Sequence, residues 1–262
     1  MEIIAADIGN SNISLAAFAQ DKLQCREDVP VQEAARLVEV FKRLRQVCLE
    51  QSGGSEIVPV VCSSVNPPAL KVVRAALLEA LNQELLVAGE DFPVEMKIAF
   101  EDSGTIGSDR LLNALAAYDV ISSAVVIADF GTAITIDCVN DQGIFIGGVI
   151  LPGLYLAAKS LNDYTALLPL VELRVPETIY GTNTIAAIQS GIYYGAIGGL
   201  REMAERYATE LGSWPHVVVT GGMGAMIAQQ CDFIDSVAPD LSLYGLCLAY
   251  GMYSESGGAD EE

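Results

Sequence analysis

The sequence predicts an α/β protein made of two similar lobes, and three observations support this fold class. Strand-like apolar runs alternate with segments of helical periodicity along the chain. Its 262 residues suit two domains of about 100–150 residues each. The run IIAADIGNSNISLAAF from Ile3 returns in outline as VVIADFGTAITIDCV from Val125. Because Asp7 and Asp129 lie 122 positions apart, this repeat indicates duplicated lobes rather than a short-period solenoid.

We place the boundary between the lobes near residue 117. An N-terminal lobe then covers residues 1–117 and a C-terminal lobe covers residues 118–254. The remaining residues 255–262 form a polar, acidic tail, which we expect to be mobile.

The first lobe begins with strands expected at 2–6 and 13–18, joined by a tight turn at Gly9-Asn10. Apolar residues at helical spacing predict a helix over about 31–50. Pro67-Pro68 predicts the start of a helix that runs to about Leu85. The other expected elements are strands at 57–62 and 94–99, a loop at 101–107 and a helix that carries Leu111 to Ala116.

The second lobe starts the same pattern again, with a buried strand at 124–128 that ends in Asp129. The other expected elements are strands at 133–139, 143–149 and 216–220, and helices at 153–162, 183–210 and 241–253.

Composition and charge exclude several classes of function. The 34 acidic and 14 basic residues give a net charge of −20, which disfavours nucleic acids and anionic membranes as partners. Six scattered cysteines without a CxxC pair are typical of reduced core thiols. The single histidine, His216, precedes an apolar run, where a structural role is favoured. The N-terminus lacks the basic residues of a signal peptide and no stretch suits a membrane span, so we expect a cytoplasmic protein.

The repeated Asp-x-Gly motif suggests a polyphosphate site. No glycine-rich loop with a following lysine and no GxGxxG motif is present, so a P-loop or a dinucleotide-binding site is disfavoured. In Asp7-x-Gly9, a strand end and a glycine turn expose backbone N–H groups to a phosphate, beside a carboxylate that suits Mg²⁺. Asp129-x-Gly131-Thr132 repeats the arrangement. A single copy would favour an ordinary hairpin, whereas two copies in matched contexts favour a pair of turns that grip one nucleotide.

Two further segments carry candidate chemistry. Gly221 and Gly222 follow a buried strand and would admit a flat base or ribose close to the backbone. Without the two Asp-x-Gly motifs, an ordinary turn before a helix would explain these glycines equally well. Asp109 and Arg110 follow Gly107-Ser108 at the start of a helix. They are either a helix cap or a general base with a guanidinium for an anionic substrate.

Taken together, these motifs resemble the type III pantothenate kinases of the actin, Hsp70 and sugar-kinase superfamily. The resemblance covers nearly the whole chain, and the order and spacing of its motifs are specific, whereas single motifs are not. The matching motifs are DIGNS at 7–11, GSDRLLNALAAY at 107–118, DFGTAITID at 129–137, GIFIGGVILPGL at 143–154, TALLP at 165–169, GTNTIAAIQSG at 181–191, VVTGG at 218–222 and LYGLCLAYG at 243–251.

The resemblance implies two ribonuclease-H-like, actin-like ATPase lobes with a nucleotide cleft between them. It also implies ATP-dependent phosphorylation of pantothenate to 4′-phosphopantothenate, the first step of coenzyme A synthesis, by a homodimer that uses Mg²⁺ and a monovalent cation, K⁺ or NH₄⁺. The alternative is a non-catalytic regulatory or accessory relative that retains the nucleotide-binding fold.

By the same resemblance, Asp109 is the general base that accepts the proton of the substrate hydroxyl. Asp129 would hold the monovalent cation, and Asp7 would lie near Mg²⁺. The expected ATP contacts are Asp7, Ile8, Gly9, Asn10, Ser11, Asn12, Ile13, Ser14, Thr132, Gly221 and Gly222. The expected pantothenate contacts are Gly107, Ser108, Asp109, Arg110 and Thr184.

Two further features concern the substrate-binding segment and the proposed dimer interface. The family usually has a tyrosine about ten residues before the arginine of its GxDR motif, whereas this chain has Phe100, which keeps the ring and loses the hydroxyl. Gly191, Gly195 and Gly199 line one helical face, which suits either packing inside the lobe or the dimer interface that the resemblance implies.

Overall fold

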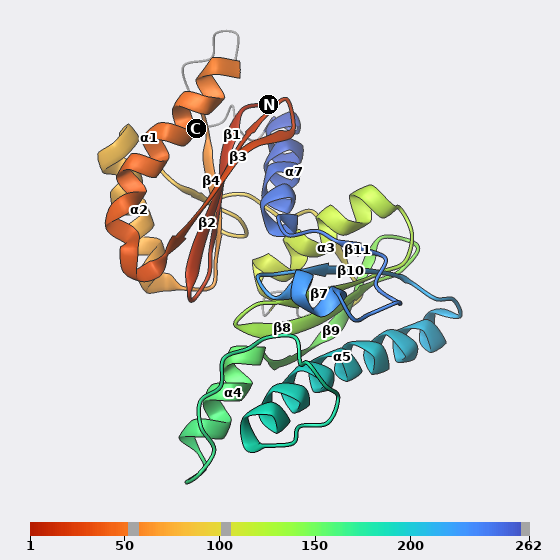
Figure 1. The fold of residues 1–262 in the computed structure, drawn as a ribbon. Coiled ribbons are helices and arrows are strands. Elements are labelled where there is room, and N and C mark those ends of the chain that lie inside the picture. The colour runs from red at the N-terminus through yellow and green to blue at the C-terminus, as the bar shows by residue number, and fades with distance from the viewer. Residues whose placement is uncertain (52–57, 101–105, 258–262) are drawn as a thin grey trace. The chain divides into compact units, whose positions relative to one another are not determined.

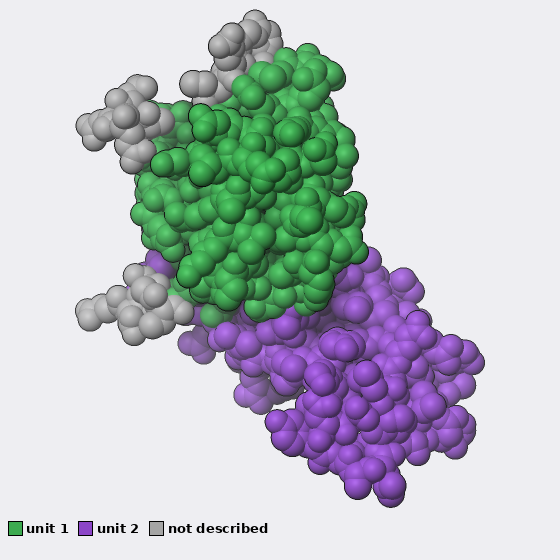
Figure 2. Space-filling model, turned by 90° about the vertical axis from the view of Figure 1, so that its left-hand side faces the viewer, with its two compact units in different colours: residues 1–96, 102–116, 241–262 green, residues 97–101, 117–240 purple. Residues whose placement is uncertain are grey.

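The computed structural model describes residues 1–51, 58–100 and 106–257. The chain divides into two compact units, coloured separately in Figure 2. Unit 1 comprises residues 1–96, 102–116 and 241–262, and unit 2 comprises residues 97–101 and 117–240. The final helix therefore belongs to the same unit as the first strands.

Unit 1 is built on a five-stranded mixed sheet with the order β3-β2-β1-β4-β5. Its strands are β1 (Ile3–Ile8), β2 (Asn12–Ala19), β3 (Lys22–Pro30), β4 (Val60–Ser64) and β5 (Leu86–Val87). The first three strands are antiparallel neighbours, whereas β4 runs parallel to β1. Since parallel strands end at the same edge, the carboxyl ends of β1 and β4 lie together, with Asp7 paired to Ser63.

Alternating side chains of β1 enter two different cores. Ile4 and Ala6 face the helices α1 (Leu37–Gln51) and α2 (Pro67–Leu81), which follow a 3₁₀ turn at Val31–Arg36. Ile3 and Ala5 face α7 (Leu241–Glu255) and the first half of α3 (Ser108–Ile121). Figure 1 shows α1 and α2 on one side of this sheet and α7 on the other. Both faces of the sheet are thus buried at its centre, which fits the continuous apolar strands β1 and β2.

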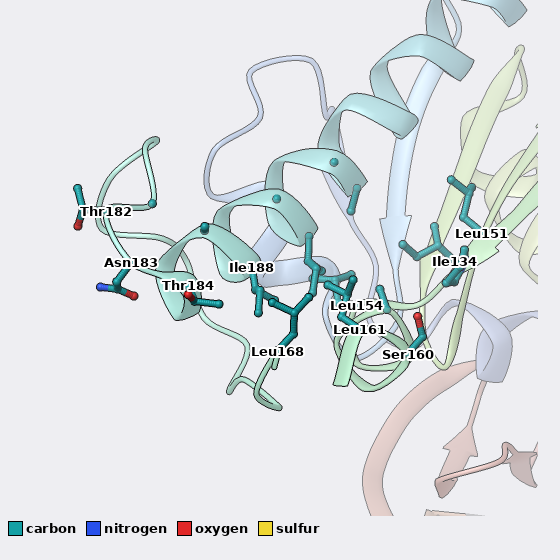
Figure 3. Close-up of a pocket in the computed structure, with 18 residues that line it drawn as sticks. Ile134, Leu151, Leu154, Ser160, Leu161, Leu168, Thr182, Asn183, Thr184 and Ile188 are labelled. Carbon is teal, nitrogen blue, oxygen red and sulfur yellow. The ribbon is translucent and has the colours of Figure 1, made fainter. Parts of the chain in front are cut away.

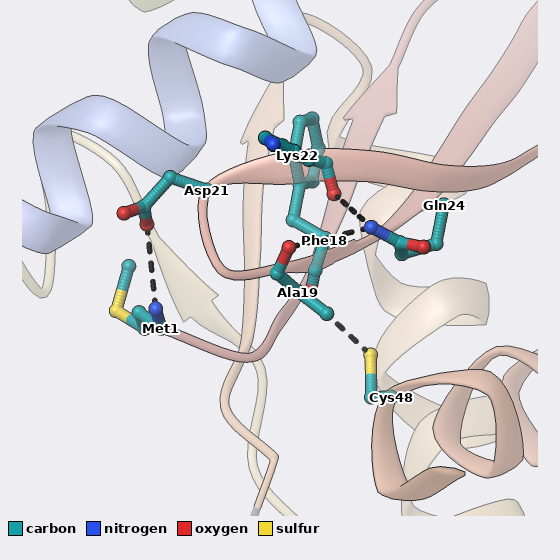
Figure 4. Close-up of polar contacts among 7 residues, drawn as sticks. All are labelled: Met1, Phe18, Ala19, Asp21, Lys22, Gln24 and Cys48. Atoms are coloured by element: carbon teal, nitrogen blue, oxygen red, sulfur yellow. Dashed lines mark hydrogen bonds and ion pairs between the residues drawn. The ribbon is translucent and has the colours of Figure 1, made fainter. Parts of the chain in front are cut away.

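The hairpin between β2 and β3 turns in two residues. Gln20 and Asp21 both have positive φ values, 51° and 60°, as a type I′ turn requires. Gln24 Nε2 donates to the carbonyl oxygens of Ala19 and Lys22, at 3.3 and 3.1 Å, and the N-terminal ammonium group pairs with Asp21 (Figure 4). These contacts fix the edge strand β3, which carries few apolar residues of its own.

Unit 2 repeats the strand order of unit 1 and adds one strand, giving β11-β10-β7-β8-β9-β6. Its strands are β6 (Lys97–Ile98), β7 (Val125–Phe130), β8 (Ala133–Val139), β9 (Ile144–Pro152), β10 (His216–Thr220) and β11 (Ser236–Val237). As in unit 1, three consecutive strands are antiparallel neighbours and the fourth, β10, pairs with the first in parallel. The bounds of β7 lie 122 positions after those of β1, so the predicted duplication is confirmed.

The helices of unit 2 are α4 (Leu154–Asp163), α5 (Thr184–Leu211) and the short α6 (Gly224–Ala228). α5 supplies Tyr193 and Leu200 to the core on one face of the sheet. Its start is capped by Asn183, whose Oδ1 accepts a hydrogen bond from Ala186 N at 2.9 Å.

Most predicted elements are present, with a few differences. The strands at 133–139 and 216–220 are found as predicted, but β3 and β5 were not expected. The helix predicted from residue 31 begins as a 3₁₀ turn, and the strand predicted at 94–99 is shortened to β6. All six cysteines are unpaired thiols, as expected. In the described part of the chain, no helix has the length and apolarity needed to cross a membrane.

Candidate active site

The site in unit 1 is centred on Asp7, near the carboxyl end of β1. Its Oδ2 accepts a hydrogen bond of 2.7 Å from the hydroxyl of Ser242, at the start of α7. Removal from water raises the pKa of Asp7 from 3.8 to about 6. The hydrogen bond from Ser242 and the charge of Arg26 oppose this rise, whereas the charge of Asp109 adds to it. A second carboxylate therefore lies close enough to affect Asp7.

That second carboxylate, Asp109, occupies the first turn of α3. Its Oδ1 accepts a hydrogen bond of 2.9 Å from the backbone N–H of Arg110. A side chain at position 107 would overlap the Asp109 carboxylate, so Gly107 provides the space that this group fills. Burial raises the pKa of Asp109, and the hydrogen bond and charge of Arg110 oppose the rise.

A buried serine connects the two segments that carry these carboxylates. Ser63 of β4 pairs with Asp7 of β1 in the sheet and is fully buried. Its Oγ lies 2.9 Å from Oγ of Ser108, the residue before Asp109. The start of α3 is thereby tied to the strand beside Asp7, which sets the separation of the two acidic groups.

The turn after Asp7 is closed at its base and exposed at its tip. Gly9 N donates to Asn12 O at 3.0 Å, while Asn10 and Ser11 are exposed. Asn66 supports the turn, because its Nδ2 donates to Gly9 O at 3.3 Å while its Oδ1 caps α2. The predicted ATP-contacting residues 7–14 thus form one continuous strand–turn–strand segment in unit 1.

The equivalent turn in unit 2 surrounds its aspartate with glycines. Asp129 pairs in register with Thr220 of β10, as Asp7 pairs with Ser63. Gly221 has a φ of 83°, and a Cβ there would overlap Asp129 Oδ1 and the backbone of Phe130. Gly131 lies next to the same carboxylate oxygen. Backbone can therefore come close to Asp129 where side chains could not.

A mainly apolar groove of about 870 Å³ lies elsewhere in unit 2. Figure 3 shows Leu154, Leu161, Leu168 and Ile188 along this groove, with Thr184 near its end. Thr184, a predicted substrate contact, is exposed at the first position of α5. Thr184 lines this groove together with Gly181 and Gly191.

Each predicted site residue thus has a definite place in one of the two units. Unit 1 holds residues 7–14 and 107–110, and unit 2 holds Asp129, Thr132, Thr184, Gly221 and Gly222. Phe100 is 40% exposed, and its ring lies 6.5 Å from that of Phe145. The neighbouring loop residues 101–105 lie outside the described residues.

The sequence analysis missed the supporting groups Ser63, Asn66 and Ser242. Asn66 precedes Pro67-Pro68 and could have been recognised as a helix cap. Ser242 lies 235 positions after Asp7, so no local signal connects the two residues.

The arrangement of the strands gives the class of fold. The duplicated β-sheet order has the arrangement of the actin-like ATPase and sugar-kinase folds. The chain superposes on the activator of 2-hydroxyisocaproyl-CoA dehydratase from Clostridium difficile with a TM-score of 0.52, at 12% identity and with coverage of 99% of this chain and 98% of that one. A Campylobacter jejuni protein described as a Baf family transcriptional activator gives a TM-score of 0.61, at 21% identity and with coverage of 97% and 100%. At these identities the likeness concerns the fold alone.

Sequence comparison then identifies the family. The family model for type III pantothenate kinase matches residues 3–206. A type III pantothenate kinase from Moorella thermoacetica is 36% identical over 249 residues, covering 95% of this chain and 98% of that protein. One from Bacillus cytotoxicus is 33% identical over 250 residues, covering 95% of each chain. The chain belongs to the type III pantothenate kinase family.

Proposed function

We propose that this protein transfers the γ-phosphoryl group of ATP to the primary hydroxyl of pantothenate. The product is 4′-phosphopantothenate, and the reaction is the first step of coenzyme A synthesis. Membership of the family supports the reaction. The single structural observation that carries it is the second carboxylate, Asp109, held close enough to Asp7 to raise its pKa.

Asp109 has the properties of a general base in this reaction. Its carboxylate is partly buried and its pKa is raised, so it accepts a proton more readily than an ordinary aspartate. Gly107 leaves room for the group and Arg110 N holds one of its oxygens. We assign the pantothenate carboxylate to the guanidinium of Arg110, with Gly107, Ser108 and Thr184 as further substrate contacts.

The turn of unit 1 is suited to the phosphates of ATP. Its tip residues Asn10 and Ser11 are exposed, and Asn66 holds its base. In unit 2, Thr132, Gly221 and Gly222 complete the proposed ATP contacts. Phosphoryl transfer depends chiefly on positioning and on neutralising charge, which such rigid turns can supply.

The residues present fit the expected cations. Among the described residues only Ser242 hydrogen-bonds the carboxylate of Asp7, at Oδ2, and no cluster of three acidic, histidine or cysteine side chains forms a metal cage. One carboxylate with waters and phosphate oxygens suits Mg²⁺, which keeps much of its hydration. Asp129, with glycine backbone beside it, suits a monovalent cation such as K⁺ or NH₄⁺. When bound, both cations would neutralise phosphate charge.

We also propose a homodimer formed through unit 2. Large apolar side chains are exposed in the segments that border the groove, including Leu167 at 91%, Tyr164 at 88% and Tyr180 at 82%. A patch of this kind commonly marks a protein interface. Light scattering after size-exclusion chromatography should give twice the chain mass, and Leu167→Glu should give the monomer. Val120→Glu, at an 83% exposed position on α3, is the matched control and should leave the dimer intact.

We place the protein in the cytoplasm, where ATP is abundant and thiols are kept reduced. Its six unpaired cysteines agree with that compartment.

The direct test of the proposed function is conversion of pantothenate. Purified protein should form 4′-phosphopantothenate, detected by mass spectrometry, in the presence of ATP, Mg²⁺ and K⁺. The rate should fall when K⁺ is replaced by Na⁺. A protein that binds ATP yet leaves pantothenate unphosphorylated in all these conditions would refute the proposal.

A further inference from the structure

The last helix of the chain reaches the proposed active site through Ser242. This residue is the second of α7, and its hydroxyl donates to Asp7 Oδ2 at 2.7 Å. Ser242 lies inside α7, past the N-cap position at which a serine side chain accepts a hydrogen bond from the helix backbone. Here the hydroxyl proton is directed at a carboxylate from the opposite end of the chain.

Packing fixes the position of this hydroxyl. Leu241 and Leu243, the two neighbours of Ser242, are 6% and 1% exposed. Leu243 and Leu246 pack in the core beneath β1, the strand that carries Asp7. The donor and acceptor are therefore anchored in the same core, so the hydrogen bond does not depend on a mobile loop.

The hydrogen bond also constrains the acceptor. Burial and the nearby charge of Asp109 both disfavour the charged form of Asp7. Of its two oxygens, Oδ2 is held by Ser242, and no described side chain donates to Oδ1. A charge-assisted hydrogen bond of this kind restricts rotation of the carboxylate and leaves one oxygen available to ligands.

We propose that Ser242 is a positioning residue for Asp7, so that α7 orients the carboxylate which accompanies the Mg²⁺ of the bound nucleotide. This inference rests on the proposed kinase function for its ligand. It assigns no contact between Ser242 and either substrate. Groups that orient a metal-associated carboxylate typically change metal affinity or activity by about 10–100-fold when removed.

The test uses the full-length protein and ADP, whose binding requires no acceptor substrate. Calorimetric titration compares ADP affinity with Mg²⁺ and with EDTA. In the wild type, Mg²⁺ should tighten binding. In Ser242→Ala, that tightening should fall about ten-fold, while metal-free binding changes less than two-fold. Steady-state assays should show a matching fall in kcat at limiting Mg²⁺, with the KM for pantothenate unchanged.

Two comparisons separate positioning from a structural role. Ser242→Thr keeps the hydroxyl and should stay within about three-fold of wild type. Ser242→Val has the shape of the threonine variant without its hydroxyl and should behave like Ser242→Ala. Ser254→Ala changes the same residue type at the far end of α7 and should match wild type. Melting temperatures show that each variant is folded. If the alanine variant does not fold, the threonine–valine pair still decides the question.

Several results would overturn the inference. The first is that Mg²⁺ does not tighten ADP binding in the wild type. The second is that the tightening in Ser242→Ala stays within two-fold of the wild-type value. The third is that the threonine and valine variants lose the tightening equally. Failure of the kinase proposal has a different signature. The wild type would then make no 4′-phosphopantothenate, while the ADP titrations would still report on Ser242 and Asp7.

Discussion

The two copies of the Asp-x-Gly turn share their scaffold and differ in what surrounds the aspartate. In unit 1, Asp7 accepts a hydrogen bond from Ser242 and lies near Asp109. In unit 2, Asp129 is surrounded by Gly131 and Gly221. The strands that deliver the two aspartates keep the same order in the two sheets, but the hairpin of unit 2 is one residue shorter, since Asp7 pairs with Ser14 and Asp129 pairs with Thr135. The different surroundings of the two aspartates come from the turns and helices that follow the strands.

This comparison teaches how a duplicated fold can divide its chemistry. The first copy recruits helix starts, from α3 and α7, which bring a second carboxylate and a hydroxyl to the strand end. The second copy follows its neighbouring strand with Gly221-Gly222 and brings backbone instead. We therefore expect the two aspartates to respond to different perturbations.

The largest expected effect concerns the carboxylate that only unit 1 contributes. Asp109→Asn removes the proposed base, and a positioned general base is worth about 10²–10⁴-fold in rate. We expect kcat to fall about 10³-fold with the melting temperature unchanged within a few degrees. Asp119→Asn, at an exposed position of the same helix α3, is the control and should retain full activity. Near-normal turnover in Asp109→Asn would remove the chemical distinction between the copies.

The next effect concerns the glycines that only unit 2 places beside its aspartate. Gly221→Ala forces a side chain into the space of Asp129 Oδ1 at a φ of 83°, and should lower the free energy of unfolding by about 2–3 kcal/mol. At Gly222 a Cβ meets nothing within 4 Å, so Gly222→Ala should cost less than about 1 kcal/mol. Urea denaturation measures both. Equal losses would show that the crowding at Gly221 is relieved elsewhere.

A smaller effect should separate the cation dependence of the two copies. Asp129→Asn should lower activity about ten-fold in K⁺ and abolish the difference between K⁺ and Na⁺, because the carboxylate proposed to hold the monovalent cation is neutralised. The Mg²⁺ concentration for half-maximal activity should stay near that of wild type. Rate measurements in the two salts, over a Mg²⁺ series, test this. A shifted Mg²⁺ requirement with K⁺ selectivity intact would reverse the assignment of the two aspartates.

The smallest expected effect is on stability at different pH values. The pKa of Asp7 is about 6 in the folded protein against 3.8 as the ordinary value. Between these values the folded state holds a proton that the unfolded chain has released, so this residue lowers stability as pH rises through the window, and its full cost is present above pH 6. Burial is the main cause, Asp109 adds to it, and Ser242 and Arg26 oppose it.

Replacing the charged group should therefore stabilise the protein only at the higher pH. Asp7→Asn should gain about 1–2 kcal/mol over wild type at pH 8, after allowance for partial exposure, and much less at pH 4.5. Urea denaturation in EDTA without nucleotide measures this difference, with the exposed Asp119→Asn as control. A gain that is the same at both pH values would show that charge burial is not its cause.

The sequence predicts much of the fold because its central strands are local apolar runs. β7, β8 and β10 are mostly buried and were placed within one or two residues. The edge strand β3 was missed because its polar residues, such as Lys22 and Asp28, leave no clear apolar alternation. Its structure comes from pairing with β2 through the Gln20-Asp21 turn, which is a tertiary constraint. β5 is two residues long and too short to give a periodic signal.

The residues of the candidate site also fall into those that local sequence predicts and those that depend on tertiary contacts. Asp7 and Gly9 could be predicted from sequence because a strand end and its turn are adjacent in the chain. The proximity of Asp109 to Asp7 followed only from resemblance to a family, since about a hundred residues separate them. Ser63 and Ser242 could not be predicted, because their contacts depend on β-sheet register and on the return of α7.

The placement of α7 has a consequence for how the protein is made on the ribosome. Leu246 and Tyr250 complete a core that also contains Ile3 and Phe18. Residues at the start of the chain therefore cannot complete their packing until residues near its end have been synthesised. Until α7 has emerged, this face of the first sheet is covered only in part, by the first half of α3, and its remaining apolar surface can engage chaperones or other nascent chains. The order of synthesis thus gives unit 2, whose core lies within residues 126–234, the chance to finish folding first.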